Sequence, residues 1–336
     1  MTSAAELHRQ SIVIDGAAPL AANAQGVLDY ISGGFTAISA TVSDNVDGAL
    51  GTLRNIGLAH KIIRAAGTAI TLIRTAADIE AAKSAGKMGI ILHFQGGDPI
   101  ENRLDYIDAY KAMGVGMIQL TYNVKNRIGD GCDERTDAGL SRFGVDVVKR
   151  LNDARIVVDC SHTGYRTTMD IIETSERPTV FSHAGCKAVH ASPRNILDEQ
   201  IKAVAQSGGL IGANAYPAFV SSDEQPSLEQ FIDHIKYIAD LVGVDHIGLG
   251  LDYFDGQHPY STLEQAQASY EKFVETGEWL PGTYPPPPYH YPKGIETPAS
   301  AVNLTDGLLG AGFSADEVQK ILGGNWMRVF REVWGE

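Results

Sequence analysis

The sequence predicts an α/β protein whose strands and helices alternate to form a (β/α)8 TIM barrel. The first observation is the alternation itself, since short β-branched apolar runs and helix-length segments follow one another from residue 11 to residue 256. The second is that polar residues follow several of these runs, as they do at the carboxyl ends of barrel strands. The third is that the 336 residues show no internal repeat and no second hydrophobic core, and one barrel domain can take ~250 residues or more.

The first half of the chain supplies five predicted strands and two predicted helices. The strands are expected at residues 12–14, 33–42, 68–73, 89–95 and 117–122. One helix is expected over residues 76–85, where Thr75 and Asp78 have the spacing of a capping pattern, and another over residues 103–113. The polar loop 123–142 that follows is long for a compact domain, and loops of this length usually serve a site.

Two Ser-His pairs follow neighbouring strands in the second half. Apolar runs at residues 156–158 and 179–181 are followed by Ser161-His162 and Ser182-His183, respectively. A segment long enough for one crossover helix lies between the two pairs. A strand–helix–strand unit has parallel strands joined by a right-handed crossover. Both imidazoles are therefore expected at the rim of the barrel where chemistry is built. A single such histidine is most often a hydrogen-bonded structural residue, but two in equivalent positions favour a functional pair.

The remaining elements complete the barrel and add an insertion. Strands are expected at residues 210–215 and 246–252, and helices at residues 143–152, 228–242, 304–309 and 315–333. Residues 257–299 break the alternation and are rich in Tyr and Pro. This segment is either a disordered linker or a packed flap, and its aromatic residues support the flap. We therefore expect one domain over residues 1–336, with an insertion at 257–299 over the barrel mouth.

The overall composition argues against several classes of protein. The formal net charge of -14 disfavours nucleic acids and anionic membranes as partners. Three cysteines, Cys132, Cys160 and Cys186, form no closely spaced framework, which favours a reducing compartment. The first residues contain no apolar signal core, and no stretch reaches ~18 consecutive apolar residues. These features predict a cytoplasmic protein.

The predicted strand ends bring several polar side chains to one rim. They are Gln95, Tyr122, His162, His183 and Asp252, with Arg194 shortly after the second Ser-His pair. Two imidazoles and an acid are a common protein contribution to a hydrolytic zinc site, which keeps one coordination position open for water. The spacing along the sequence is weak evidence by itself, because ligands on different barrel strands have no fixed interval.

The motifs around these residues resemble the membrane (renal) dipeptidase family of the amidohydrolase superfamily, over nearly the whole chain. The resemblance is carried by residues 158–162 (VDCSH), 181–183 (FSH), 192–195 (SPRN), 248–252 (GLGLD) and 324–329 (GNWMRV). It implies a two-zinc barrel dipeptidase in which His162 and His183 bind one zinc. It also implies that Asp252 handles protons and that Arg194 grips the substrate carboxylate.

The chain departs from the family pattern at the other ligand positions. The family's Asp-Gly-His-Asn-Asp reads here as Asp-Gly-Ala-Ala-Pro over residues 15–19, so the first-strand His and Asp are missing. Gln95 stands at the position of the bridging glutamate, and Tyr122 at the position of a histidine after strand five. Of the family's three carboxylates only Asp252 is kept, and two cations without an anionic bridge would repel strongly. We therefore expect one zinc at most, held by the two Ser-His histidines and a weak Gln95 oxygen.

Two further residues have both a functional and a structural interpretation. His93 lies two residues before Gln95 and should point to the same barrel face. It is either a substitute ligand or substrate contact, or a hydrogen-bonded core histidine. Tyr122 is either a donor that polarises the scissile carbonyl or a core phenol.

Arg194 and its neighbour Asn195 are the predicted substrate-binding residues. A guanidinium pairs with a carboxylate through two parallel hydrogen bonds, which suits a substrate with a free acid end. The structural alternative is a salt bridge from Arg194 to Asp198 or Glu199.

The sequence therefore predicts a metal-dependent hydrolase of the renal dipeptidase type, acting on an amide or related C–N bond of a small carboxylate-bearing substrate. Because the first-strand ligands are missing, a specialised substrate is favoured over ordinary dipeptides. One alternative is a family member that lacks zinc and binds a small acid without turnover. Another is a non-hydrolytic reaction in the same pocket, such as an elimination or isomerisation. The resemblance also suggests a homodimer.

Overall fold

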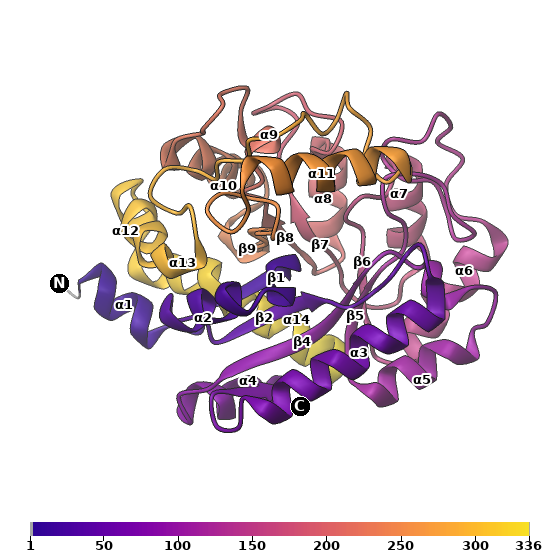
Figure 1. The fold of residues 1–336 in the computed structure, drawn as a ribbon, viewed down its shortest axis with the longest axis horizontal. Coiled ribbons are helices and arrows are strands. Elements are labelled where there is room, and N and C mark those ends of the chain that lie inside the picture. The colour runs from indigo at the N-terminus through magenta and orange to yellow at the C-terminus, as the bar shows by residue number, and fades with distance from the viewer. Residues whose placement is uncertain (1–2, 336) are drawn as a thin grey trace.

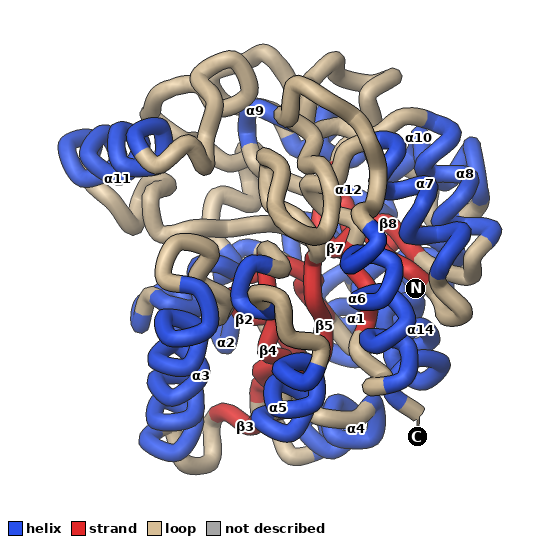
Figure 2. The backbone as a smooth tube through the Cα atoms, turned by 90° about the vertical axis from the view of Figure 1, so that its right-hand side faces the viewer, coloured by secondary structure: helices blue, strands red, loops and turns tan. Residues whose placement is uncertain are grey.

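Eight parallel strands close into a barrel in the computed structural model, which describes residues 3–335 (Figures 1 and 2). The ring consists of β1 (Ile14–Ala18), β2 (Ala37–Thr41), β4 (Met88–Gln95), β5 (Val115–Gln119), β6 (Val157–Asp159), β7 (Thr179–Ala184), β8 (Leu210–Ala213) and β9 (Ile247–Leu249). The pairing of β2 with β4, from Ala37 opposite Gly89 to Thr41 opposite His93, closes the ring. A ninth strand, β3 (Ile70–Leu72), pairs only with the first residues of β4 and lies outside the ring. The predicted (β/α)8 barrel is confirmed.

Helices lie around this ring and at its two ends. They are α1 (Ala4–Gln10), α2 (Ala24–Ser32), α3 (Gly48–Ala65), α4 (Ala76–Ser84), α5 (Asp105–Met113), α6 (Arg142–Asp153), α7 (Tyr165–Thr174), α8 (Asp198–Gln206), α9 (Pro217–Val220), α10 (Leu228–Val242), α11 (Leu263–Glu275), α12 (Val302–Gly310), α13 (Ala315–Gln319) and α14 (Asn325–Trp334). No helix among the described residues is long and apolar enough to cross a membrane.

Most predicted elements are present, with shifted ends. The capping box of α4 forms between Thr75 and Asp78 as the sequence predicts. The helix predicted over residues 315–333 is instead interrupted, because a π-helical turn over Lys320–Gly324 separates α13 from α14. The prediction also missed α3, whose leucines at positions 50, 53 and 58 are exposed. With apolar residues on its solvent side, α3 lacks the single buried stripe by which amphipathic helices are recognised.

The amino-terminal end of the barrel is sealed by α14. Trp326, Phe330 and Trp334 pack in one apolar cluster with strand residues such as Ile14 and Val157. The indole N–H groups of Trp326 and Trp334 donate to the carbonyl oxygens of Leu249 and Gly116, at 3.0 and 2.9 Å. A Cβ atom at Gly248 would lie 2.6 Å from the Trp326 indole, so the close approach of α14 requires glycine there. This end of the molecule is therefore filled, and any chemistry is left to the opposite end.

The carboxyl-terminal end of the barrel is covered by loops and by the segment 257–299. Helix α11 of this segment runs across the mouth (Figure 1), and Figure 2 shows the long loops gathered at the same end. Four aromatic side chains of the segment are buried in the main apolar cluster: Trp279, Tyr284, Tyr289 and Tyr291. The segment thus contributes core side chains to the mouth of the barrel.

Candidate active site

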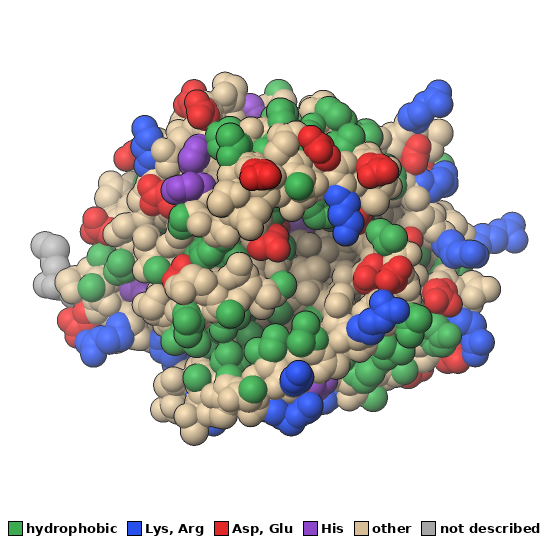
Figure 3. Space-filling view, in the orientation of Figure 1, with side chains coloured by type: hydrophobic (Ala, Val, Ile, Leu, Met, Phe, Trp, Pro, Cys, Tyr) green, Lys and Arg blue, Asp and Glu red, His purple; other side chains and the backbone are tan. Residues whose placement is uncertain are grey.

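A cavity of about 540 Å³ opens at the carboxyl ends of the strands, and the face that contains its entrance is drawn in Figure 3. Barrel loops and the segment 257–299 both line it. Among its lining residues are Gln95, Tyr122, His162, Tyr216, Asp252, Phe254, Trp279 and Tyr284. The cavity therefore brings together several residues that lie far apart in the sequence.

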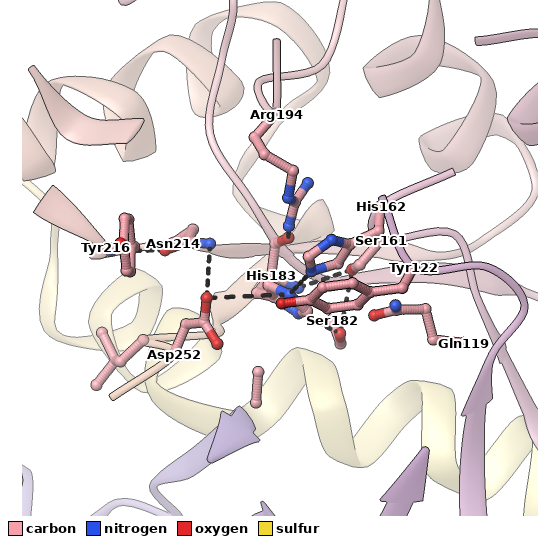
Figure 4. Close-up of polar contacts among 12 residues, drawn as sticks. Gln119, Tyr122, Ser161, His162, Ser182, His183, Arg194, Asn214, Tyr216 and Asp252 are labelled. Atoms are coloured by element: carbon pink, nitrogen blue, oxygen red, sulfur yellow. Dashed lines mark hydrogen bonds and ion pairs between the residues drawn. The ribbon is translucent and has the colours of Figure 1, made fainter. Parts of the chain in front are cut away.

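His162 lines this cavity and directly contacts His183, which lies buried behind it. His162 follows β6, and His183 lies near the end of β7. Their Nε2 atoms are 2.9 Å apart, and both side chains are buried (Figure 4). Two nitrogen ligands on a tetrahedral zinc ion lie about 3.3 Å apart, given Zn–N bonds of about 2.0–2.1 Å. The pair is thus already spaced nearly as a shared cation requires.

The neighbours of His162 fix which of its nitrogens carries the proton. Its Nδ1 lies 2.6 Å from the Oδ1 atom of Asn123. The Asn123 amide is oriented by its own Nδ2 group, which donates to the backbone oxygen of Glu278 at 2.7 Å. An amide oxygen only accepts, so His162 donates from Nδ1 and its Nε2 carries a lone pair.

The same reasoning applies to His183. Its Nδ1 lies 2.7 Å from the hydroxyl of Ser182. That hydroxyl donates its single proton to the carboxylate of Asp159, so it accepts from His183 and leaves a lone pair on Nε2. Burial, followed by the charge of Arg194, lowers the pKa of both imidazoles well below the ordinary value. Two neutral nitrogen lone pairs therefore face each other, and this donor set fits one metal ion between them.

Asp252 is the acid nearest to the pair. Its Oδ2 lies 4.0 Å from His183 Nε2 and accepts from Asn214 Nδ2 at 3.3 Å. Burial raises the pKa of Asp252 to about 7, against the opposing effect of Arg194. Both Asp252 and His162 have a left-handed backbone, with φ of 60° and 64°. Such conformations cost energy for residues other than glycine and cluster at functional sites.

Tyr122 lies against the face of His162. The two rings stack with centroids 4.2 Å apart and planes at 23°. The Tyr122 hydroxyl accepts a hydrogen bond from the indole N–H of Trp279 at 3.1 Å. Burial raises the pKa of Tyr122, so its phenol stays protonated at neutral pH. Because the indole occupies an acceptor position, the phenol proton remains available to a group in the cavity.

Arg194 is buried without a carboxylate partner among residues 3–335. It is 2% exposed, its Nη2 makes a long contact of 3.4 Å to the His183 oxygen, and its Nε has no partner. No ion pair joins it to Asp198 or Glu199 within the described part of the chain, so the structural alternative from the sequence is wrong. It lines a second cavity of about 190 Å³ that shares the wall of His162 with the first.

The other predicted residues are placed in different ways. Gln95 ends β4 and lines the main cavity. His93 is fully buried and lies 3.0 Å from the Asp159 carboxylate through Nε2. Asn195 donates to the backbone oxygens of His190 and Phe219 and lines the smaller cavity. The structure therefore gathers Gln95, Tyr122, His162, His183 and Asp252, keeps Arg194 adjacent, and gives His93 and Asn195 supporting contacts.

The first strand contributes no ligand. Ala17 is buried, and Asp15 accepts hydrogen bonds from the Ala17 and Leu251 backbone N–H groups and from the Tyr30 hydroxyl. Within the described residues, no group of three or more His, Cys, Asp or Glu side chains is arranged to hold a metal ion.

Sequence reasoning missed the residues that orient these groups. Asn214 follows β8, so the rule that strand ends carry site residues would have found it. Asn123, Asp159 and Ser182 each adjoin a predicted site residue or lie within three positions of one, but nothing in their spacing reveals which atom they contact.

Comparison with known proteins points to one family. The family model for membrane dipeptidase, peptidase family M19, matches residues 28–276. A solved structure of an amidohydrolase from Pseudomonas aeruginosa is 35% identical, with 99% of this chain and 100% of that chain covered and a TM-score of 0.89. An uncharacterized protein in the pqqA 5′ region of Klebsiella pneumoniae is 26% identical, over 84% of this chain and 95% of that protein. The dipeptidase aclJ of Aspergillus oryzae is 26% identical over 84% of this chain, which spans only 61% of that relative.

Proposed function

Because the chain belongs to the membrane dipeptidase family, peptidase family M19, we propose that it is a hydrolase that uses one metal ion to cleave an amide bond. The family is metal-dependent, and zinc is the ion that suits imidazole ligands in a hydrolytic site. The substrate is a small molecule with a free carboxylate. In this proposal the segment 257–299 is an insertion that covers the barrel mouth and shapes the pocket.

The opposed lone pairs of His162 and His183 carry the proposal. Each Nδ1 donates to a fixed acceptor, so both Nε2 atoms can ligate the same ion. Gln95 supplies a neutral oxygen at the rim of the cavity. A second ion finds no ligand side chain at Ala17 or Pro19, where the family has a histidine and an aspartate, and an unbridged pair of divalent ions would repel.

A bound zinc ion would polarise the scissile carbonyl and lower the pKa of water to about 7. The protein's own groups then move the protons. Asp252, whose pKa burial raises to about 7, accepts the proton of the attacking water as the C–O bond forms. The same carboxyl returns that proton to the leaving nitrogen as the C–N bond breaks. Tyr122 donates its free O–H to the carbonyl oxygen, where negative charge develops.

Arg194 supplies the contact for the substrate carboxylate. Its guanidinium is buried, carries no paired charge among the described residues and adjoins His183. Leaving a cation in that state is costly unless an anion arrives to pair with it. Because the two cavities meet at His162, the carboxylate would bind on the far side of that residue from Trp279.

One observation favours a second candidate function. The part of the chain that the structure describes has no group of three titratable metal ligands. A protein that binds a small acid at Arg194, without a metal and without turnover, agrees with that observation.

Metal content and turnover together test the proposal. We expect about one zinc per chain in protein purified with zinc present, and turnover of some members of a panel of dipeptides and N-acyl amino acids. His162→Ala should lose both the metal and the activity. His60→Ala is a matched control, since the His60 ring on α3 bonds the Met113 backbone oxygen and no other group in the described residues, and it should retain both. A wild-type protein that retains no zinc would contradict the proposed hydrolase activity and support the binding function instead.

A further inference from the structure

Two stacked rings of the segment 257–299 lie beside the histidine pair. Trp279 stacks on Tyr284 with ring centroids 4.5 Å apart and planes at 9°, and its other face stacks on Phe273 at 4.5 Å. Both Trp279 and Tyr284 are buried, at 5% and 3% exposure. With both faces covered, the indole can offer only its edge to a neighbour, and that edge carries its N–H group.

The polar edges of this stack contact two consecutive residues after β5. The Trp279 N–H donates to the Tyr122 hydroxyl at 3.1 Å, and the Tyr284 hydroxyl donates to Asn123 Oδ1 at 3.2 Å. The backbone oxygen of Glu278 accepts from the other end of the Asn123 amide at 2.7 Å. Three hydrogen bonds thus tie residues 278–284 to this pair.

Tyr122 and Asn123 in turn hold His162 in two different ways. Tyr122 stacks on the imidazole face at 4.2 Å, which restricts the tilt of the ring. Asn123 accepts from Nδ1 at 2.6 Å, which fixes the tautomer and the rotation of the ring. Both restraints are needed to aim the Nε2 lone pair at His183.

We propose that Trp279 and Tyr284 are positioning residues, which set the orientation and tautomer of His162 through Tyr122 and Asn123. This inference rests on the proposed function, because it concerns how well His162 serves as a metal ligand. The structural elements concerned lie more than 100 residues apart in the sequence, so the metal site is completed only when the segment 257–299 has packed. Partners that orient a ligating histidine typically change metal affinity or activity by about 10–100-fold when removed.

Tyr284→Phe is the sharpest test, because it removes the hydroxyl and keeps the stacked ring. Tyr289→Phe is the matched control, since Tyr289 is a buried tyrosine of the same segment whose hydroxyl donates to the Pro285 oxygen and contacts neither Tyr122 nor Asn123 within residues 3–335. We expect Tyr284→Phe to weaken zinc binding by about tenfold in competition with a chromogenic chelator. It should lower kcat far more than it changes KM. Tyr289→Phe should match the wild type, and Asn123→Leu should exceed the effect of Tyr284→Phe.

Nitrogen-15 NMR of the imidazoles gives a readout that needs no metal. The wild-type apoprotein should show His162 protonated at Nδ1, assigned by comparison with His162→Ala, and Tyr284→Phe should shift it toward a mixture of tautomers. If Tyr284→Phe leaves zinc affinity, kcat and the His162 tautomer as in Tyr289→Phe, the stack is packing alone and the inference is overturned. If the wild type binds no zinc, the proposed function fails, and the tautomer measurement still decides the inference.

Discussion

The two ends of the barrel differ in how completely they are packed and in how fully their polar groups are hydrogen-bonded. At the amino-terminal end, the rings of α14 fill the space between the strands, and their indole N–H groups all find acceptors. At the mouth, there is a cavity, a buried guanidinium nitrogen without a partner and two residues with left-handed backbone. The amino-terminal end is therefore packed like a protein core. The mouth holds strain and unpaired charge, which a folded protein can keep only if the rest of the molecule is stable enough to tolerate them.

The largest expected effect comes from breaking the sealed end. Trp326→Ala removes a fully buried indole, and we expect it to lower the free energy of unfolding by about 3–5 kcal/mol. Urea denaturation monitored by circular dichroism measures this loss. Zinc affinity in the folded variant should be unchanged, and a loss of zinc comparable to the loss of stability would show that the two ends are not independent.

Tyr122→Phe at the mouth is expected to reduce activity strongly and stability to a smaller extent. Loss of a donor to a developing oxyanion costs about 10²–10³-fold in kcat, or about 2.7–4 kcal/mol. Because the phenyl ring still stacks on His162, we expect the loss in kcat to be about 10²-fold. Stability should fall by about 1–3 kcal/mol, because the buried Trp279 N–H loses the phenol oxygen that accepts its hydrogen bond. Steady-state kinetics and thermal unfolding of the same preparation separate the two effects, and a kcat within threefold of wild type would remove Tyr122 from the mechanism.

Asp15 lies between the two ends and predicts a pH dependence of stability. Burial raises its pKa from 3.8 to about 7, although Leu251, Tyr30 and Ala17 donate hydrogen bonds to it. An acid whose pKa is raised on folding is favoured in its neutral form. Its contribution is therefore present below pH ~4 and is lost as pH rises toward ~7, by about 2 kcal/mol between pH 5 and pH 7.

Asp15→Asn should remove this part of the pH dependence. The comparison is urea unfolding of both proteins at pH 5, 6 and 7, with the difference between them as the quantity of interest. Equal slopes for the two proteins would mean that Asp15 ionises in the folded protein at its ordinary pKa.

The smallest expected effect on stability is a gain. Arg194→Met removes a buried cation that no carboxylate pairs with in residues 3–335, and it keeps most of the apolar contact with Phe219. We expect stability to rise by about 1 kcal/mol while KM for carboxylate-bearing substrates rises strongly. Lysine at the same position, which keeps the charge, should not be stabilised. A destabilised Arg194→Met would indicate that the guanidinium serves the fold.

The fold could be predicted from the sequence because its signals are local and repeated. Most strands contain or directly follow a short apolar run, such as residues 156–158 at β6, and α10 appears at residues 228–242 as predicted. The predictions were wrong where tertiary packing, rather than the local sequence pattern, determines the structure. The exposed leucines of α3 obscured its helical period, and the π-helical turn before α14 depends on how that helix enters the barrel base.

The candidate site was predictable only in part, for a related reason. His162 and Asp252 follow strands and His183 lies near the end of one, so topology alone brings them together. The proton positions of the imidazoles depend instead on Asn123 and Ser182, whose contacts arise from tertiary structure. That Arg194 makes no ion pair within residues 3–335 is likewise a property of the fold, because acids at positions 198 and 199 are close to it in sequence.

The left-handed backbone at positions 162 and 252 also limits how this pocket can be redesigned. Asparagine, aspartate and glycine tolerate that conformation, whereas β-branched residues do so only at considerable cost. A library that varies position 162 would therefore return mostly short polar side chains, whatever chemistry is selected. New ligands for a different ion are better introduced at Ala17 or Gln95, whose φ angles are not positive.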